Sequence, residues 1–193
     1  MEQRKTRARR LEILTSAAGA FRRRGYHGAS MGEIAQALHM TKGSLYYYFK
    51  SKEEILFFCH DYSLDVLLET LARVEGGGGS ASEKLGGLIQ AFVHHILDDL
   101  RGTAMTLDFH ALSAARLRRI IAKRDRFDRG MRRLLQEGMD AGAFAAGETK
   151  LLTFAILGAL NWIPRWFDPG GPATSDEIGR AFAEYLVRGL QRR

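Results

Sequence analysis

The sequence predicts an all-α protein in which a three-helix head, residues 1–52, stands on a larger helical body, residues 53–193. Three observations support this fold class. Only three of the 193 residues are proline, the residue that helices tolerate least. Leu, Ala, Arg and Glu are abundant and are good helix formers, and runs of β-branched residues are few. We expect about nine helices in total.

The net charge of +7 is located almost entirely in the head. Residues 1–52 contain eleven Lys or Arg and three Glu, whereas residues 53–193 contain 18 basic and 19 acidic side chains. A small basic region joined to a nearly neutral body is typical of a protein that binds nucleic acid through one part of its surface. We therefore expect double-stranded DNA to be a partner of the head.

The chain has one cysteine, Cys59, which cannot form an internal disulfide and fits a reducing cytoplasm. The N-terminus is not followed by the apolar segment of a signal peptide. The most apolar run, residues 151–160, is shorter than the roughly 20 residues that a membrane-spanning helix needs. We expect a cytoplasmic protein that makes no membrane contact.

The first two helices of the head are predicted by periodicity and capping. Apolar residues recur at helical spacing from about residue 6 to residue 24, and Gly25 is expected to end this helix. Residues 30–33, Ser-Met-Gly-Glu, form a capping box that predicts a second helix from Met31 to about Leu38. The arginines of the first helix are interpreted mainly as a solvated face.

A third short helix is predicted from Thr41, its cap, to Phe49. Leu45 and Phe49 share one face and are suited to burial, which leaves lysine, hydroxyl and tyrosine side chains on the other faces. Two short helices joined by a tight turn form a helix-turn-helix, whose second helix enters the DNA major groove. His39 occupies a turn position that often needs positive φ.

A set of residues spread over about 50 positions of the head carries a more specific signal. The set comprises Phe21, Gly25, Ser30, Ile34, Ala35, the run 42–49 and the pair Lys52-Glu53. In residue types and spacing it resembles the DNA-binding head of the TetR family of bacterial transcriptional regulators. The chain departs from the family pattern at His39, where Gly is commoner.

The head contributes the candidate DNA-binding residues. Gly43 allows the backbone to approach the duplex closely, and Lys42 and Tyr46 are best placed for base edges. The other hydroxyl and lysine side chains are suited to phosphate contacts, although each tyrosine has the alternative of packing against the first helix. The full set is Ser30, Thr41, Lys42, Gly43, Ser44, Tyr46, Tyr47, Tyr48 and Lys52.

The body begins with a long helix. Residues 51–54, Ser-Lys-Glu-Glu, read as a second capping box and predict a helix to about Val74, followed by the glycine loop 76–79. Residues 80–83 form a third capping box, and the apolar pattern from Leu85 to Leu100 predicts an amphipathic helix. Because the long helix adjoins the recognition helix, a displacement of its far end would swing the head.

Two polar patterns in the body have alternative interpretations. His94, His95, Asp98 and Asp99 have a spacing that metal ligands can use, but on an apolar helix we expect no metal site. Residues 116–133 carry many basic side chains on a helix that extends to about residue 141. A solvated charged face explains most of them, and the alternative is that two or three contact the phosphates of an anionic ligand.

Residues 150–167 are apolar on nearly every side of a predicted helix, which predicts burial between the core and a partner. Pro164 is expected to kink or end this helix, and a last helix is expected to begin near Ser175. Small residues on both helices would allow close approach, so we expect the two helices to pair with their copies in a homodimer. A dimer also presents two recognition helices to a palindromic operator.

The segment 161–172 resembles the corresponding stretch of TetR-family repressors that respond to acyl-CoA thioesters and regulate fatty-acid, sterol or aromatic-acid catabolism. The resemblance implies a repressor released from its operator by a small-molecule effector, a long-chain or other acyl-CoA, with no resident cofactor. The alternative for the two tryptophans is packing at the dimer interface. The candidate effector-binding residues are Phe92, His95, Ile96, Phe109, His110, Phe127, Phe154, Leu157, Asn161, Trp162, Arg165 and Trp166.

Three other functions are considered. An aromatic-lined cavity also suits a repressor of an efflux or detoxification gene that responds to a lipophilic drug. An enzyme is disfavoured because no Ser or Cys nucleophile with a paired base and no glycine-rich cofactor loop is visible. A nonspecific architectural DNA protein would have no need of a nearly neutral body of about 140 residues.

Overall fold

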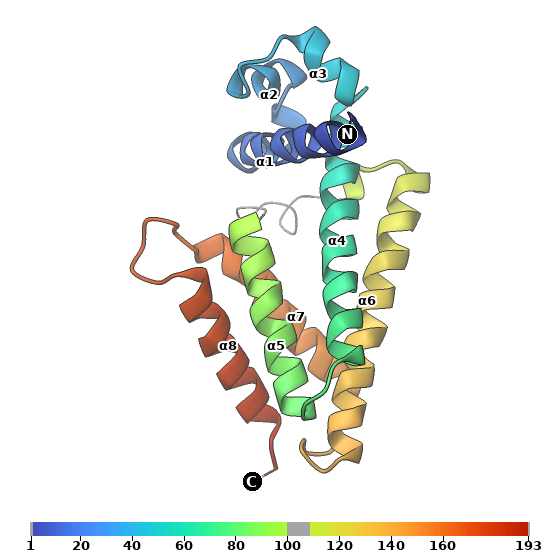
Figure 1. Cartoon of the computed structure of the whole chain (residues 1–193), viewed down its shortest axis with the longest axis vertical. Coiled ribbons are helices and arrows are strands. Elements are labelled where there is room, and N and C mark those ends of the chain that lie inside the picture. The colour runs from blue at the N-terminus through green and yellow to red at the C-terminus, as the bar shows by residue number, and fades with distance from the viewer. Residues whose placement is uncertain (1, 100–108, 193) are drawn as a thin grey trace.

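The computed structural model describes residues 2–99 and 109–192, and it is all-α as predicted. Over these ranges the chain forms eight α-helices, a π-helical turn and a 3-10 turn, with one isolated bridge between Phe144 and Gln191 as the sole extended pairing. Figure 1 shows a compact head at one end of an elongated helical body.

The head consists of α1 (Glu2–Gly28), α2 (Met31–Ala37) and α3 (Lys42–Tyr48). Helix α1 lies across the body, and α2 and α3 lie on its far side (Figure 1). The predicted stop at Gly25 is a kink, with φ 69° and ψ 167°, beyond which one more helical turn follows. Glycine takes this conformation without the Cβ penalty that other residues meet.

Capping and turn chemistry set the boundaries of α2 and α3. The Ser30 hydroxyl accepts a hydrogen bond from the Glu33 amide, and the Glu33 carboxylate accepts one from the Ser30 amide, which confirms the capping box. His39 has φ 51° in the turn between the helices, as its position predicted. Such a φ is uncommon for a residue with a side chain.

The body contains α4 (Lys52–Gly76), α5 (Ala81–His94), α6 (Ala114–Asp140), α7 (Thr149–Trp166) and α8 (Ser175–Leu190). The π turn η1 (His95–Asp99) follows α5, and the 3-10 turn η2 (Phe109–Ala111) precedes α6. The long helix, the capping box at Ser80 and the basic helix match their predictions. Leu100, which was predicted to continue the amphipathic pattern, lies outside the described residues.

One capping prediction needs correction. The Ser51 hydroxyl accepts from the Glu54 amide, but the Glu54 carboxylate accepts from the amide of Lys50 at 2.7 Å and not from that of Ser51. The Glu54 carboxylate therefore accepts from the residue before Ser51, and this bond connects the segment that follows α3 to the first turn of α4. The hydrogen bond that would complete the capping box is thus replaced by one that crosses the joint between the head and the body.

Two hydrophobic clusters form the core. The head cluster contains Leu45 and Phe49 but also continues through the first turns of α4 to Leu64. It includes Leu112, which follows η2, and Ile120 of α6. Cys59 lies in this cluster, fully buried, and burial raises the pKa of its thiol to about 12. The body cluster lies between α5, α6, α7, α8 and the far half of α4.

Helices α5 and α8 pack closely together, which the sequence pattern did not predict. A Cβ on Gly179 would lie 3.4 Å from the Gln90 Cα, so a glycine at this position allows the two backbones to approach. Gly86 faces Ala183 and Val187 across the same contact. Gly158 on α7 and Gly189 on α8 are two of the small residues that were expected to allow close approach between copies of these helices, and both face open space in the single chain.

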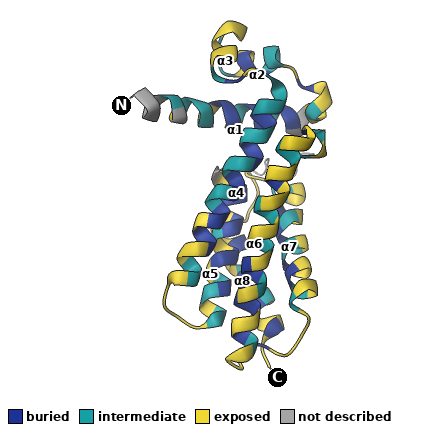
Figure 2. Ribbon diagram, turned by 90° about the vertical axis from the view of Figure 1, so that its right-hand side faces the viewer, coloured by how far each residue is buried: buried dark blue, intermediate teal, exposed yellow. Residues whose placement is uncertain are grey.

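Helix α7 is buried on one side in the single chain, and the predicted burial of its other side against a partner stays a prediction. It buries Thr153, Ile156, Leu160 and Ile163, but the opposite side exposes large apolar residues in the single chain (Figure 2). The exposed set on α7 and α8 is Leu151, Phe154, Trp162, Trp166 and Tyr185. Pro164 lies inside α7, which ends two residues later at Trp166. Among the described helices, none has the length and apolarity to cross a membrane.

Candidate functional site

The outer surface of α3 carries a concentrated set of polar side chains. The Thr41 hydroxyl accepts a hydrogen bond from the Ser44 amide at 3.1 Å and lies 2.9 Å from the Ser44 hydroxyl. Leu45 and Phe49 are fully buried beneath the helix, as predicted. The residues left on the exposed surface are Thr41, Lys42, Gly43, Ser44, Tyr46 and Tyr47.

The three tyrosines divide into two groups. Tyr46 and Tyr47 are exposed, the latter by 73%, so neither packs into the head. Tyr48 is half-buried, and its ring lies edge-on to that of Tyr47 with 5.1 Å between centroids. This contact orients Tyr47 outward. The predicted DNA contacts of the three side chains stay predictions.

Two glycines shape the same surface. Gly43 points to open space, because the nearest atom to an added Cβ would be the Thr41 hydroxyl oxygen at 3.8 Å. Gly32 on α2 leaves room for Lys42, whose Cε would lie 2.7 Å from a Cβ at that position. The lysine stem therefore lies across α2 while its residue remains exposed.

Some basic residues of the head are occupied by internal contacts. The Lys52 ammonium donates to the carbonyls of His27 at 3.1 Å and Ala29 at 3.0 Å, and it lies 4.5 Å from the centroid of the Tyr26 ring. Lys50 donates to the Tyr46 carbonyl at 3.0 Å, which satisfies the end of α3. Lys52 thus holds the kinked end of α1 against the start of α4, and its predicted phosphate contact stays a prediction.

Arg10 has a structural position. Its guanidinium carbon lies 4.6 Å from the ring centroid of Phe49 and 4.4 Å from that of Phe58, and one nitrogen lies 3.8 Å from a Glu54 carboxylate oxygen. Stacking of this kind adds stability when the cation is partly desolvated. Arg10 therefore joins α1 to both sides of the joint at which the head meets α4.

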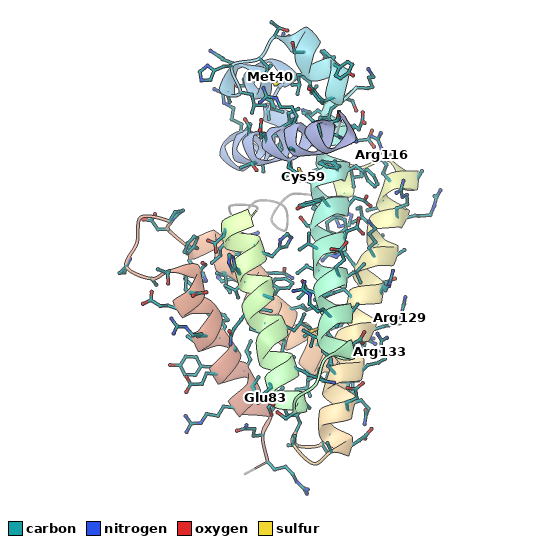
Figure 3. The ribbon with its side chains drawn as sticks, viewed as in Figure 1. Met40, Cys59, Glu83, Arg116, Arg129 and Arg133 are labelled. Carbon is teal, nitrogen blue, oxygen red and sulfur yellow. The ribbon has the colours of Figure 1, made fainter. Side chains whose placement is uncertain are left out.

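A second set of contacts links this joint to α6. The Glu53 carboxylate accepts from the Ser113 amide at 2.9 Å and lies 3.0 Å from an Arg116 nitrogen (Arg116 is labelled in Figure 3). The hydrogen bonds from Ser113, followed by the charge of Arg116, hold the pKa of Glu53 below its ordinary value of 4.5. The first turn of α4 is thus fixed to the start of α6.

Further along, the basic residues of α6 pair with α4. The Lys123 ammonium lies 2.6 Å from carboxylate oxygens of both Asp61 and Asp65, and Arg133 lies 2.6 Å from Glu75. These contacts, with that of Arg116, extend along most of the seam between the two helices. They support the interpretation that most basic residues of α6 are paired or solvated.

The predicted effector-binding residues separate into an inner and an outer group. Phe92 and Phe127 are buried in the body core, and their ring centroids are 6.1 Å apart. His95 and Ile96, which follow Phe92 in the chain, are also buried. Leu157, Asn161 and Phe109 are half-buried, whereas His110 is exposed and stacks on the Phe109 ring with centroids 4.4 Å apart.

The outer group lies on the exposed side of α7. Trp162 is 57% exposed, and the Arg165 guanidinium carbon lies 4.7 Å from its ring centroid. Trp166 stacks on Phe182 of α8 with centroids 6.2 Å apart, and Phe154 is also exposed. In the single chain these residues do not line the interior where Phe92 and Phe127 lie. Their position favours the interface alternative for the tryptophans.

A hollow of about 600 Å³ lies between η1 and the loop that joins α7 to α8. Asp98 lies at this hollow and is close to two partners, with the Ser175 hydroxyl 2.5 Å and the His94 Nδ1 2.6 Å from its carboxylate. These contacts involve His94 and Asp98, two of the four side chains that have the spacing of metal ligands. In the ranges 2–99 and 109–192, no three His, Cys, Asp or Glu side chains are grouped to hold a metal ion.

Family models match both parts of the chain. The family described as "Bacterial regulatory proteins, tetR family" matches residues 13–57. The family described as "Tetracyclin repressor-like, C-terminal domain" matches residues 78–190, which is more than half of the chain. The two matches fall on the head with its joint to α4 and on the body.

Individual proteins are similar along nearly the whole chain. The HTH-type transcriptional repressor KstR2 of Mycolicibacterium smegmatis is 28% identical over 187 residues, covering 95% of this chain and 91% of the relative. The TetR family transcriptional regulator PfmR from Thermus thermophilus is 31% identical with a TM-score of 0.80, covering 93% of this chain and 99% of PfmR. AibR, solved in complex with isovaleryl coenzyme A and operator DNA, is 28% identical with a TM-score of 0.77, covering 94% of this chain and 98% of AibR.

The open space at Gly43 generates a prediction that separates folding from DNA binding. Gly43→Ala adds a methyl group that meets no protein atom closer than 3.8 Å, so thermal stability should not fall and should rise with the gain in helix propensity, about 0.5–1 kcal/mol. If the DNA backbone approaches this position, affinity for a duplex selected by the wild-type protein should drop at least about tenfold, measured by fluorescence anisotropy. Unchanged affinity would contradict the assignment of this surface.

The Glu53 contacts predict a pH-dependent loss of stability. Because the folded pKa of Glu53 is lowered, its contribution is present above the ordinary value of 4.5 and is lost as the pH falls through the folded pKa. Glu53→Gln should cost about 1 kcal/mol at pH 7, discounted for partial exposure. In urea unfolding, the difference from wild type should shrink below pH 4.5.

Glu12→Gln provides the control, because Glu12 forms a surface pair with Arg9 within α1. A difference for Glu53→Gln that stays constant or grows as the solution becomes acidic would count against the role assigned to Glu53.

Proposed function

We propose, since the chain belongs to the TetR family of bacterial regulatory proteins, that it is a transcriptional repressor controlled by an acyl-CoA. In this proposal a homodimer binds a palindromic operator, and a long-chain or other acyl-CoA releases it. The observation that carries the DNA-binding part is the outer surface of α3, where hydroxyl, lysine and tyrosine groups surround an unobstructed glycine. The similarity to repressors supports the regulatory role.

The contacts of α3 with DNA follow from its surface chemistry. Hydroxyl groups of Thr41, Ser44 and Tyr47 are suited to phosphate oxygens, and Lys42 and Tyr46 reach from the exposed side of the helix towards base edges. A helix of seven residues offers few base contacts. Two heads bound to successive major grooves supply the remaining specificity, which requires a dimer.

The dimer is proposed to form through the exposed apolar side of α7 and the adjoining part of α8. Leu151 is 63% exposed and Tyr185 is 73% exposed, together with both tryptophans of the chain. An apolar surface of this kind on a single chain is typical of an interface. A two-fold arrangement of α7 and α8 with their copies would cover it.

The effector class is supported by similarity and by the composition of the body. AibR, which resembles this chain along nearly its full length, binds isovaleryl coenzyme A. Phe92, Ile96 and Phe127 provide an apolar interior for an acyl group. The Trp162 and Arg165 pair, exposed at the end of α7, is available to the charged CoA portion or to the partner chain.

The body is coupled to the head through α4. This helix begins at the joint with α3 and ends in the body core, and its first turn is fixed to α6 through Glu53. A ligand that favours a different packing of α4 and α6 therefore changes the spacing of the two heads. Only a difference in affinity between the two arrangements can produce this effect.

The dimer proposal predicts that charge on the exposed side of α7 yields monomers. Leu151→Glu and Trp162→Glu should each shift the mass measured by light scattering after gel filtration from dimer to monomer, because a carboxylate would be buried without a partner. Ile121→Glu is the matched control, since Ile121 is an exposed apolar residue on α6. A dimer that persists in both α7 variants would rule out this interface.

The effector proposal predicts that palmitoyl-CoA weakens operator binding. In an anisotropy titration, saturating palmitoyl-CoA should raise the dissociation constant for DNA by about 5- to 150-fold, with free CoA and palmitate as controls. Unchanged DNA binding would remove the acyl-CoA claim. Release by an uncharged or cationic lipophilic drug, without a response to acyl-CoA, would instead favour the efflux alternative.

A further inference from the structure

Arg124 occupies a core-facing position on α6. It lies four residues after Ile120 and three before Phe127, which are 0% and 4% exposed. Residues three and four apart project from the same side of a helix. The Arg124 side chain is therefore directed towards the inside of the body and is half-buried.

The surroundings of this guanidinium are mainly apolar. Its carbon lies 4.4 Å from the ring centroid of Phe109, which also packs edge-on against His60. Burial lowers the pKa of Arg124, and the opposing influence comes from the exposed Asp125. Within the described residues, no carboxylate forms an ion pair with Arg124. A guanidinium withdrawn from water without a counter-charge is costly.

The other basic residues of the helix make the contrast clear. Arg116, Lys123, Arg132 and Arg133 each lie within ion-pair distance of a carboxylate. Arg118, Arg119, Arg126 and Arg129 are exposed to solvent (Arg129 is labelled in Figure 3). Arg124 combines burial with the lack of such a partner in the part of the chain that the structure describes.

A second polar group of the body lies on α7, where Asn161 is half-buried. The Asn161 amide oxygen is buried and has no hydrogen-bond partner among the described residues. Buried polar atoms of proteins nearly always have a partner, so an unpaired one indicates a missing water or ligand group. Arg124 and Asn161 are thus two polar groups of the body whose usual partners are missing among the described residues. Arg124 lies three residues before Phe127, whose ring packs on that of Phe92.

We propose that Arg124 is the anion contact of the effector site, where it binds a carboxylate or phosphate oxygen of a ligand whose apolar part lies against Phe92 and Phe127. The proposal rests on the proposed function, because the ligand is the effector. Among the basic residues of α6, the proposal thus assigns the contact with an anionic ligand to Arg124.

The test compares Arg124→Met with wild type and with Arg129→Met, a matched control on the exposed side of the same helix. Three probes share one chain length: decanoyl-CoA, decanoate and the uncharged decan-1-ol, with binding measured by calorimetry. Arg124→Met should weaken binding of the anionic probes at least about tenfold and leave decan-1-ol and the control variant unchanged. Arg124→Lys should restore part of the affinity. The probe that responds distinguishes a phosphate source from a carboxylate source.

Affinity of Arg124→Met for the anionic probes within twofold of wild type would overturn the proposal. An equal loss for all three probes would also overturn it, because it would indicate damage to the core. If wild type binds none of the probes, the acyl-CoA effector fails, and the melting temperature decides the role of Arg124. An uncompensated guanidinium predicts that Arg124→Met melts roughly 2–4 °C higher. A lower melting temperature would show that Arg124 has a structural role.

Discussion

The head is too small to bury its own core, and this constraint determines how the two parts of the protein are connected. Phe49 and Leu45 need cover that the three head helices do not supply. Leu56 of α4, Leu112 after η2 and Ile120 of α6 belong to the same apolar cluster and provide it. Arg10 stacks between Phe49 and Phe58 across the same boundary. Because one apolar cluster spans both parts, the orientation of the recognition helix cannot be independent of the packing of α4 and α6.

The basic helix α6 contributes to the connection between head and body in two ways. Its apolar side joins the shared cluster, and its charged side chains form ion pairs with α4. Arg116 and Lys123 bind carboxylates along α4, whereas Arg124 points inward between two buried residues. One helix therefore carries both the contacts that hold the head and the residue that we assign to the ligand. A ligand at Arg124 would act on the seam about two to three helical turns from the Glu53 contact, which is a short route from effector to DNA.

Local signals in the sequence predicted most of the helices. The capping boxes at Ser30 and Ser80, the cap at Thr41 and the spacing of Leu45 and Phe49 each depend on neighbours within four residues, so the sequence contains them. The partners of Lys52 and Glu54, and the α5–α8 contact at Gly179, depend on elements that are distant in the chain. Trp162 and Phe154 were predicted to line a pocket, but both are exposed in the single chain. On a helix that is apolar on nearly every side, the sequence does not indicate which side faces the core.

Cys59 is the sole sulfhydryl of the chain, and its burial has a consequence for signalling and for experiment. A thiol shielded from water, with a pKa of about 12, offers no thiolate to peroxide or to alkylating reagents in the folded state. In the folded state Cys59 is therefore protected from these reagents. A cysteine introduced at an exposed position of α3 or α7 would carry a spin label or fluorophore without competition, so the separation of two heads is measurable in the otherwise unaltered chain.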